Sequence, residues 1–216
     1  MIKNIWAALL LLLFFQNESI AQTNTDSIYV QKKFVNIEEA LKNPQVVLEL
    51  DLSNQKIQLP DSIWTLFTNL EYLSLRNDHL KTIPETIGNL KKLKTLDISG
   101  NDFSILPSSF ARLTSLEELF LNDEKNFVFA ENIPTLSKLP KLKILHLEND
   151  NLTSLPQNIY LLSQIEALYL NNNKFNTIPE GLKNLTNLNY LDFQGNKFSD
   201  PYIKNLDENF GFKIRF

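Results

Sequence analysis

The chain has 216 residues, of which 39 are Leu and 26 are Asn, and it contains 5 Gly, 1 Met and no Cys. A hydrophobic fraction of 43% and a charged fraction of 21% exclude wholesale disorder and a polytopic membrane protein. The net charge of −4 offers no basic surface for nucleic acid or for an anionic membrane, so neither is expected as a partner.

The first 21 residues have the features of a secretory signal peptide. Lys3 gives a positive start, Ile5 to Phe15 are apolar, and Ser19 and Ala21 are the small residues of a cleavage site. This apolar run is shorter than the roughly 20 residues that a spanning helix needs. We therefore expect an exported protein that is periplasmic, cell-surface or extracellular and has no membrane span after cleavage. The lack of Cys favours a bacterial source.

Residues 22–46 are expected to form an N-terminal tail and a capping helix. Asn36 has the side chain of an N-cap, and Glu39 stands at the third helical position, where an acid completes a capping box. The predicted helix runs from Ile37 to Lys42, because Asn43 and the Pro after it stop it.

A repeated pattern occupies residues 47–198. A Leu-x-Leu pair and the polar residue that follows it recur at spacings of 23, 23, 23, 26, 23 and 23 residues. The polar positions in register are Gln55, Asp78, Asn101, Glu124, Asp150, Asn173 and Asn196. Downstream, a Pro preceded by Leu or Ile recurs at Pro60, Pro84, Pro107, Pro134, Pro156 and Pro179.

Each repeat combines two periodicities. The Leu-x-Leu alternation predicts a short strand with one apolar face, whereas Ile87, Leu90 and Leu93 lie three apart, as in a helical or 3₁₀ turn. No unit can bury its Leu side chains alone, so neighbouring units stack. An Asn at the turn can both donate to and accept from the open backbone groups there. Where Asp or Glu replaces it, the donor is lost and we expect a looser or water-bridged turn.

The pattern resembles the 23-residue class of the leucine-rich repeat family, written LxxLxLxxNxLxxLPxxIxxLxx. The cleanest copies are residues 93–115 (LKTLDISGNDFSILPSSFARLTS) and 165–187 (IEALYLNNNKFNTIPEGLKNLTN). The resemblance implies an α/β leucine-rich repeat solenoid, or horseshoe, of about seven repeats, with a concave parallel β-sheet and convex short helical or 3₁₀ turns. It also implies a scaffold that binds proteins.

Residues 199–216 are predicted to form a C-terminal cap. Asp200 is a suitable N-cap and Pro201 a suitable first helical residue, so a helix should run to about Asn209. Residues 212–216 can then add an edge strand. Together these segments cover the last unit of the repeat.

The residues between the two Leu of each unit point away from the core. Phe120, His146 and Tyr169 follow one another in this row on strands about 4.8 Å apart, which predicts a contiguous patch of exposed rings. The insertion in the fourth unit, residues 125–131, is expected to abut this patch, and its Phe127 and Phe129 either pack on the solenoid edge or reach toward a ligand. The residues predicted to contact a partner are Tyr72, Arg76, Phe120, Ile144, His146, Glu148, Tyr169 and Tyr190.

The same positions do not predict catalysis. His146 and Glu148 share one strand face, but the nearest Ser, Ser99, is two strands away and places no nucleophile. His79 and His146 lack the paired spacing of metal ligands. No catalytic, cofactor or metal site is expected, and the chain is interpreted as not an enzyme.

Two functions remain open from the sequence. The first is a non-catalytic exported scaffold that mediates protein–protein interaction through the concave face, as a monomer. The alternative is a surface or periplasmic module that binds glycan or cell-wall polymer, with Tyr72, Tyr169 and Tyr190 as stacking platforms.

Overall fold

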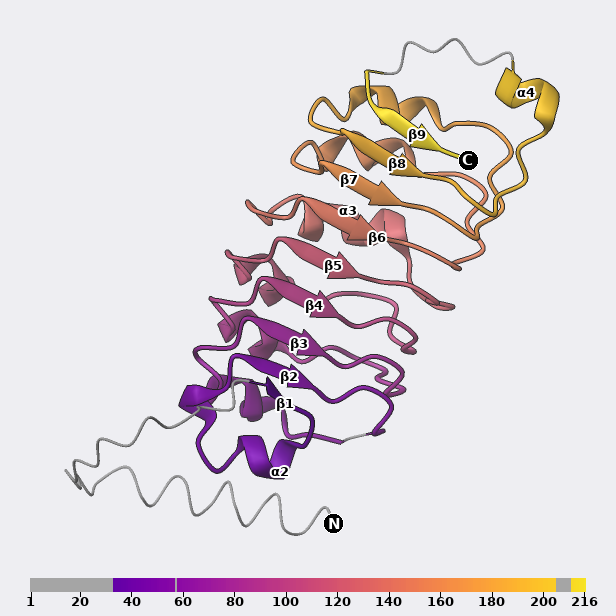
Figure 1. The fold of residues 1–216 in the computed structure, drawn as a ribbon. Coiled ribbons are helices and arrows are strands. Elements are labelled where there is room, and N and C mark those ends of the chain that lie inside the picture. The colour runs from indigo at the N-terminus through magenta and orange to yellow at the C-terminus, as the bar shows by residue number, and fades with distance from the viewer. Residues whose placement is uncertain (1–32, 57, 205–210) are drawn as a thin grey trace.

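The computed structural model describes residues 33–56, 58–204 and 211–216. In this part of the chain, nine parallel strands form one sheet in which each strand pairs with the next along the sequence (Figure 1). The strands are β1 (Lys33–Phe34), β2 (Glu49–Asp51), β3 (Tyr72–Ser74), β4 (Thr95–Asp97), β5 (Glu118–Phe120), β6 (Ile144–His146), β7 (Ala167–Tyr169), β8 (Tyr190–Asp192) and β9 (Lys213–Arg215). Strands β2 to β8 correspond to the seven predicted units, which confirms the α/β repeat solenoid.

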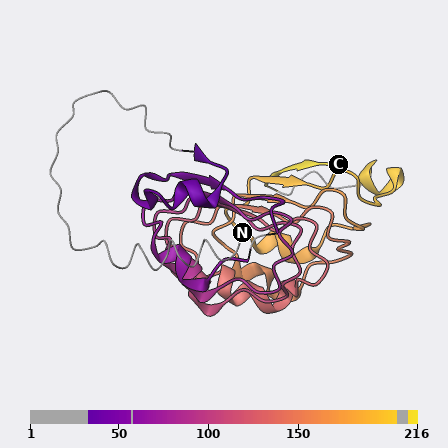
Figure 2. The same cartoon turned by 90° about the horizontal axis from the view of Figure 1, so that it is seen from below.

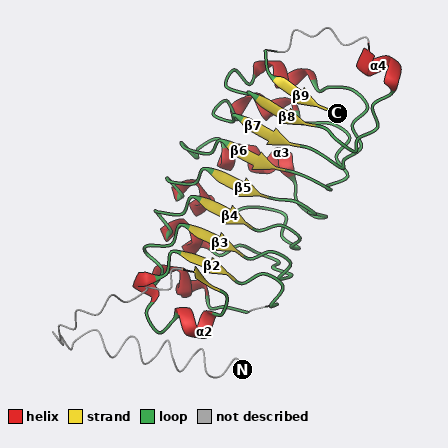
Figure 3. Cartoon of the chain, in the orientation of Figure 1, coloured by secondary structure: helices red, strands yellow, loops and turns green. Residues whose placement is uncertain are grey.

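Short helices line the side opposite the sheet, as Figures 2 and 3 show. The repeated ones are 3₁₀ helices, as the spacing predicts: η2 (Asp61–Thr65), η3 (Glu85–Asn89), η4 (Ser108–Arg112), η5 (Gln157–Leu161) and η6 (Glu180–Asn184). A Pro directly precedes each of them, and its carbonyl accepts the first helical bond, as in Ile87 N to Pro84 O at 3.1 Å. Pro suits this position because its φ is fixed and the helix needs no N–H from it.

The core lies between the sheet and these helices and runs through all the units. In the fifth unit, for example, Leu145 and Leu147 of the strand segment and Ile159 and Leu162 of the helical side are all at most 1% exposed. Because each coil shares this layer with the next, removing one buried Leu opens a cavity between neighbouring coils.

Asn at the turns bonds the coils together as predicted. The amide nitrogen of Asn173 donates to the carbonyls of Leu147 (2.7 Å) and Leu170 (3.0 Å), while its oxygen accepts from the backbone N–H of Asp150 and Leu152. Asn101 repeats the arrangement three units earlier, with its amide nitrogen 2.9 Å from Leu75 O and 2.7 Å from Ile98 O.

A second use of Asn explains more of its excess. The residue just before the polar register position has positive φ, in the left-handed region, in every one of the seven units. It is Asn54, Asn77, Gly100, Asp123, Asn149, Asn172 and Gly195. Asn, Asp and Gly tolerate this conformation best. Each turn therefore favours Asn at this position as well as at the polar register position that follows it.

The turns with acidic residues differ from the prediction. Asp78 is 5% exposed, and its Oδ1 accepts from the backbone N–H of Gln55 (2.8 Å) and Lys56 (2.9 Å). These bonds are as short as those that Asn101 accepts, so the expected loosening was wrong on the acceptor side. The donor side is missing instead: Oδ2 of Asp78 and Oε2 of Glu124 are buried without a hydrogen-bond partner.

The fourth unit shows a second correction. Pro134 was aligned with the prolines that precede the 3₁₀ helices, but it lies inside helix α3 (Phe129–Leu136). The 26-residue spacing places Ile133, not Pro134, at that position. The insertion packs on the solenoid and does not abut the ring patch: the Phe127 ring lies 5.7 Å from that of Phe103, edge to face, and Phe129 is 7% exposed.

Additional elements cover the two ends. Helix α2 spans Ile37–Ala40, shorter than predicted, and the Asn36 side chain accepts from Glu39 N as an N-cap should. A 3₁₀ turn η1 (Pro44–Val46) follows, and strand β1 precedes α2, which the sequence did not predict. At the other end, helix α4 (Asp200–Lys204) and the predicted edge strand β9 follow the last unit. The signal-peptide prediction and the rest of the predicted C-terminal helix lie outside the described residues.

Candidate functional site

The register of the sheet places the predicted ring residues side by side. Phe120 pairs with His146 and His146 with Tyr169. The rings of Phe120 and His146 stack at 3.9 Å and 14°, and those of His146 and Tyr169 at 4.4 Å and 7°. Tyr190 continues the series at 5.4 Å from Tyr169, tilted by 49°. These four residues are called the aromatic stack below.

Both nitrogens of His146 face carboxylates. Nε2 lies 3.0 Å from Oε1 of Glu118, and Nδ1 lies 3.2 Å from Oε2 of Glu148. A carboxylate oxygen only accepts, so each contact is a hydrogen bond when the ring nitrogen that faces the carboxylate carries a proton.

The side chain of Asn122 holds the carboxylate beside His146 in place. Asn122 donates its amide N–H to Oε2 of Glu148 at 2.8 Å and accepts from the backbone N–H of Glu148 at 2.8 Å. The backbone N–H of Asn122 in turn donates to Oγ of Ser99 at 3.1 Å. The stack therefore rests on a network that crosses strands β4 to β6.

The stack is less exposed than the sequence suggested. His146 is 8% exposed, because the neighbouring rings cover both of its faces. Phe120, Tyr169 and Tyr190 are half-buried. Burial raises the pKa of the Tyr169 hydroxyl, and the nearby Tyr190 and Glu118 raise it further.

Six of the eight predicted residues gather in one place. Ile144 is half-buried and lies two residues before His146 on β6, on the same face. Tyr72 and Arg76 lie apart from them: Tyr72 belongs to β3, and the exposed Arg76 places Nη2 3.6 Å from Oδ2 of Asp123. Glu118 was missed, although it precedes Phe120 by two residues on the same strand face.

The site carries no arrangement typical of catalysis or metal binding. Both nitrogens of His146 are engaged by carboxylates, so neither is left to activate a nucleophile. Among the described residues, no group of three or more His, Asp or Glu side chains is placed to hold a metal ion. The described helices also include none long and apolar enough to cross a membrane.

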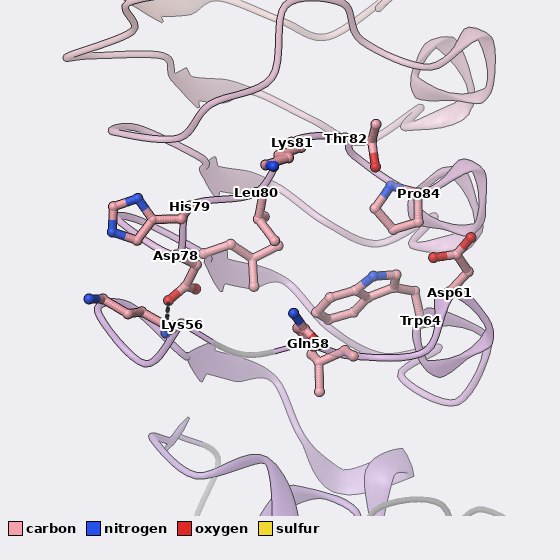
Figure 4. A pocket seen from close by; sticks show the side chains of 12 residues that line it. Lys56, Gln58, Asp61, Trp64, Asp78, His79, Leu80, Lys81, Thr82 and Pro84 are labelled. Atoms are coloured by element: carbon pink, nitrogen blue, oxygen red, sulfur yellow. Dashed lines mark hydrogen bonds between the residues drawn. The ribbon is translucent and has the colours of Figure 1, made fainter. Parts of the chain in front are cut away.

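A cavity of about 500 Å³ lies elsewhere, between the turn after β3 and helix η2. Figure 4 shows Trp64 and Asp78 among the residues that line it, with Asp78 bonded to the backbone of Lys56. Its lining residues include none of those predicted to bind a partner. The aromatic stack is therefore the stronger candidate site.

The fold and this face define a class of protein: a solenoid of short repeats that leaves one side of a parallel sheet open. A family model described as a leucine-rich repeat region matches residues 26–137, and a second leucine-rich repeat model matches residues 140–198. The chain belongs to the leucine-rich repeat family.

Curated relatives share only part of their length with this chain. The volume-regulated anion channel subunit LRRC8A of Homo sapiens is 33% identical over 127 residues, which are 54% of this chain and 15% of that protein. The TMV resistance protein N of Nicotiana glutinosa is 43% identical over 68 residues, 31% of this chain and 6% of that protein. The chain thus spans a small fraction of these relatives.

Solved bacterial structures have the same fold. An internalin C2 from Listeria monocytogenes matches with a TM-score of 0.57 and 25% identity, covering 79% of this chain and 72% of that one. A leucine-rich repeat protein from Leptospira interrogans, LIC12759, matches with a TM-score of 0.53 and 26% identity, covering 86% and 58%. An internalin InlF from Listeria monocytogenes, at 24% identity and a TM-score of 0.58 over 79% of this chain and 48% of that one, supports the fold alone.

Proposed function

We propose that the chain is an exported, non-catalytic binding scaffold that holds another protein against the open face of its sheet, with the aromatic stack as the anchor. The observation that carries this proposal is the stack itself. Phe120, His146 and Tyr169 are packed against one another at 3.9 and 4.4 Å on three adjacent strands. Their rings lose little conformational freedom on binding, which favours affinity.

Export rests on the residues at the N-terminus. The charged start, the short apolar run and the small residues at Ser19 and Ala21 favour a cleaved signal peptide. We infer a bacterial periplasmic, surface or secreted location. Sequencing the N-terminus of the exported protein tests this directly: Gln22 as the first residue supports it, and Met1 contradicts it.

The ring geometry favours a protein over a glycan. A sugar stacks on the free face of an aromatic ring, whereas His146 has both faces covered and Tyr169 has one face against His146. Half-buried rings beside carboxylates that accept hydrogen bonds suit protein side chains. A glycan array separates the two functions, because the protein scaffold predicts no sugar that binds through Tyr169 and Tyr190.

Affinity capture from the exported fraction of the source organism, followed by mass spectrometry, identifies partners. The affinity of each partner is then measured for wild type and for variants. Phe120→Ala with Tyr169→Ala should weaken a partner by about 30-fold or more, as loss of anchor residues does. Tyr160→Ala with Leu161→Ala is the matched control, because these side chains are 52% and 39% exposed on the opposite face. Equal affinity of the folded stack variant and wild type would refute the proposal.

A further inference from the structure

The contacts of His146 with two carboxylates depend on the number of protons present. Nε2 lies 3.0 Å from Oε1 of Glu118, and Nδ1 lies 3.2 Å from Oε2 of Glu148. Because an ionised carboxylate only accepts, both contacts are hydrogen bonds when two protons lie among the three side chains, and a neutral imidazole brings one. The second proton sits on the ring or on a carboxyl group. Removing it leaves one contact as a ring lone pair that faces a carboxylate oxygen.

The two carboxylates are not held equally. Oε2 of Glu148 also accepts from the Asn122 amide at 2.8 Å, and the backbone N–H of Glu148 donates to the oxygen of that amide at 2.8 Å. Within the described residues, the carboxylate of Glu118 has His146 as a hydrogen-bonding partner and no second one. The Glu118 side chain is 30% exposed, against 20% for Glu148. When one contact fails, Glu118 is therefore the carboxylate that can move toward solvent.

The other titratable groups on this face do not replace the lost proton. Arg76 and Arg215 already lie beside other carboxylates, those of Asp123 and Asp192, each at 3.6 Å. Loss of one proton from the contacts of His146 therefore leaves an added negative charge next to the stack. The titratable groups that face this ring, or lie two strands away in the same rows, are Glu118 of β5, Glu148 after β6, Tyr169 of β7, Asp97 of β4, and Tyr190 and Asp192 of β8.

We propose that the proton between His146 and Glu118 is a switch: with it the aromatic stack is fixed and holds the partner, and without it, at higher pH, Glu118 leaves the ring and the partner is released. Imidazole suits this role because it is the side chain that ordinarily changes charge between about pH 5 and about pH 8. His146 stands in the middle of the stack, so a change in its bonds reaches the rings of Phe120 and Tyr169 directly. This inference rests on the proposed function and adds its regulation.

Nuclear magnetic resonance with isotopically labelled histidine rings tests the switch without a partner. As the pH rises from about 5 to about 9, the His146 ring should lose its proton from Nε2 and keep the one on Nδ1, which faces the fixed Glu148. The resonances of Phe120 and Tyr169 should shift with the same midpoint. The exposed His79, beside Asp102, is the internal control, and its titration should not move them.

Three results of this titration would overturn the inference. The first is a neutral His146 ring that keeps its proton on Nε2. The second is a His146 ring that titrates while Phe120 and Tyr169 stay constant. The third is a ring that does not titrate in this range.

Glu118→Gln connects the proton to partner binding. A Gln side chain can accept from a protonated Nε2 or donate to a bare one, so the stack should stay fixed at both values of pH. Between about pH 6 and about pH 8.5, the affinity of wild type for a captured partner should fall about tenfold more than that of Glu118→Gln. Titration of the partner itself affects both proteins equally. Glu117→Gln, at the exposed acid directly before Glu118, is the matched control and should behave as wild type.

The outcomes separate this inference from the proposed function. If Phe120→Ala with Tyr169→Ala weakens the partner, while wild type and Glu118→Gln show the same pH dependence, the switch fails and the scaffold function stands. If the stack variant leaves the affinity unchanged, both fail. If Glu118→Gln does not fold, the position of the remaining ring proton in wild type still decides.

Discussion

Glu124 gives a prediction that follows from one buried carboxyl group. It is 6% exposed, its Oε1 accepts from the backbone N–H of Asn101 at 3.2 Å, and its Oε2 has no hydrogen-bond partner. Burial raises the pKa of this carboxyl from 4.5 to about 8, and the charges of Asp150 and Asp102 act in the same direction. At neutral pH the folded protein therefore keeps a proton that the unfolded chain loses.

The sign of the effect on stability follows from proton linkage. The stability contributed by protonated Glu124 is fully present below pH 4.5, decreases as the pH rises, and is lost above about pH 8. Each unit between the two pKa values contributes about 1.4 kcal/mol, so the largest possible loss of unfolding free energy is near 5 kcal/mol. Solvent screening reduces the expected loss to about 2 to 3 kcal/mol. Glu124→Gln replaces the acid with an amide that can donate without titrating.

Urea denaturation at about pH 5 and about pH 9 measures this difference. We expect Glu124→Gln and wild type to have similar free energies of unfolding at the lower pH. At the higher pH the variant should be more stable by about 2 to 3 kcal/mol. Glu131→Gln, an exposed acid on α3, is the control and should follow wild type at both values. Identical pH dependence of Glu124→Gln and wild type would refute the reasoning.

Further predictions concern the packing of the coils. Asn173→Ala leaves the carbonyls of Leu147 and Leu170 without its amide and should lower the free energy of unfolding by about 1 to 3 kcal/mol, while the exposed Asn176→Ala should not. Leu170→Ala should lower it by about 2 to 5 kcal/mol in chemical denaturation, because the side chain is fully buried; an unchanged midpoint would contradict the repeat alignment. Phe127→Ala should lower the free energy of unfolding by about 2 kcal/mol and leave the affinity for the partner unchanged. A folded Phe127→Ala variant that has lost affinity would instead show that the insertion binds the partner.

The repeat made much of the fold predictable. Because the spacing is 23 residues in all units but one, side chains one period apart must pair across the sheet, and the registers of Phe120, His146 and Tyr169 followed from counting alone. The Asn bonds were predictable for the same reason: the amide has both a donor and an acceptor where each strand ends.

Other features depend on contacts that no local pattern encodes. The two residues of β1 pair with β2 only because the solenoid leaves that edge open. Pro134 resembled the other prolines, yet the longer unit shifted the register and placed it within α3. The burial of His146 arises from its neighbours on two other strands. The positive φ before each turn position was not predicted, because Asn is so abundant in the chain that its recurrence there did not stand out.

Photocrosslinking tests the central claim most directly, namely that the aromatic stack on the open sheet face holds the partner. The crosslinker p-benzoylphenylalanine would replace Tyr169 in the stack or Tyr160 on the opposite face, where the native side chain is 52% exposed. We expect the captured partner to crosslink at position 169 and not at position 160. Crosslinking at position 160 with none at position 169, in a folded protein that still binds its partner, would contradict the claim.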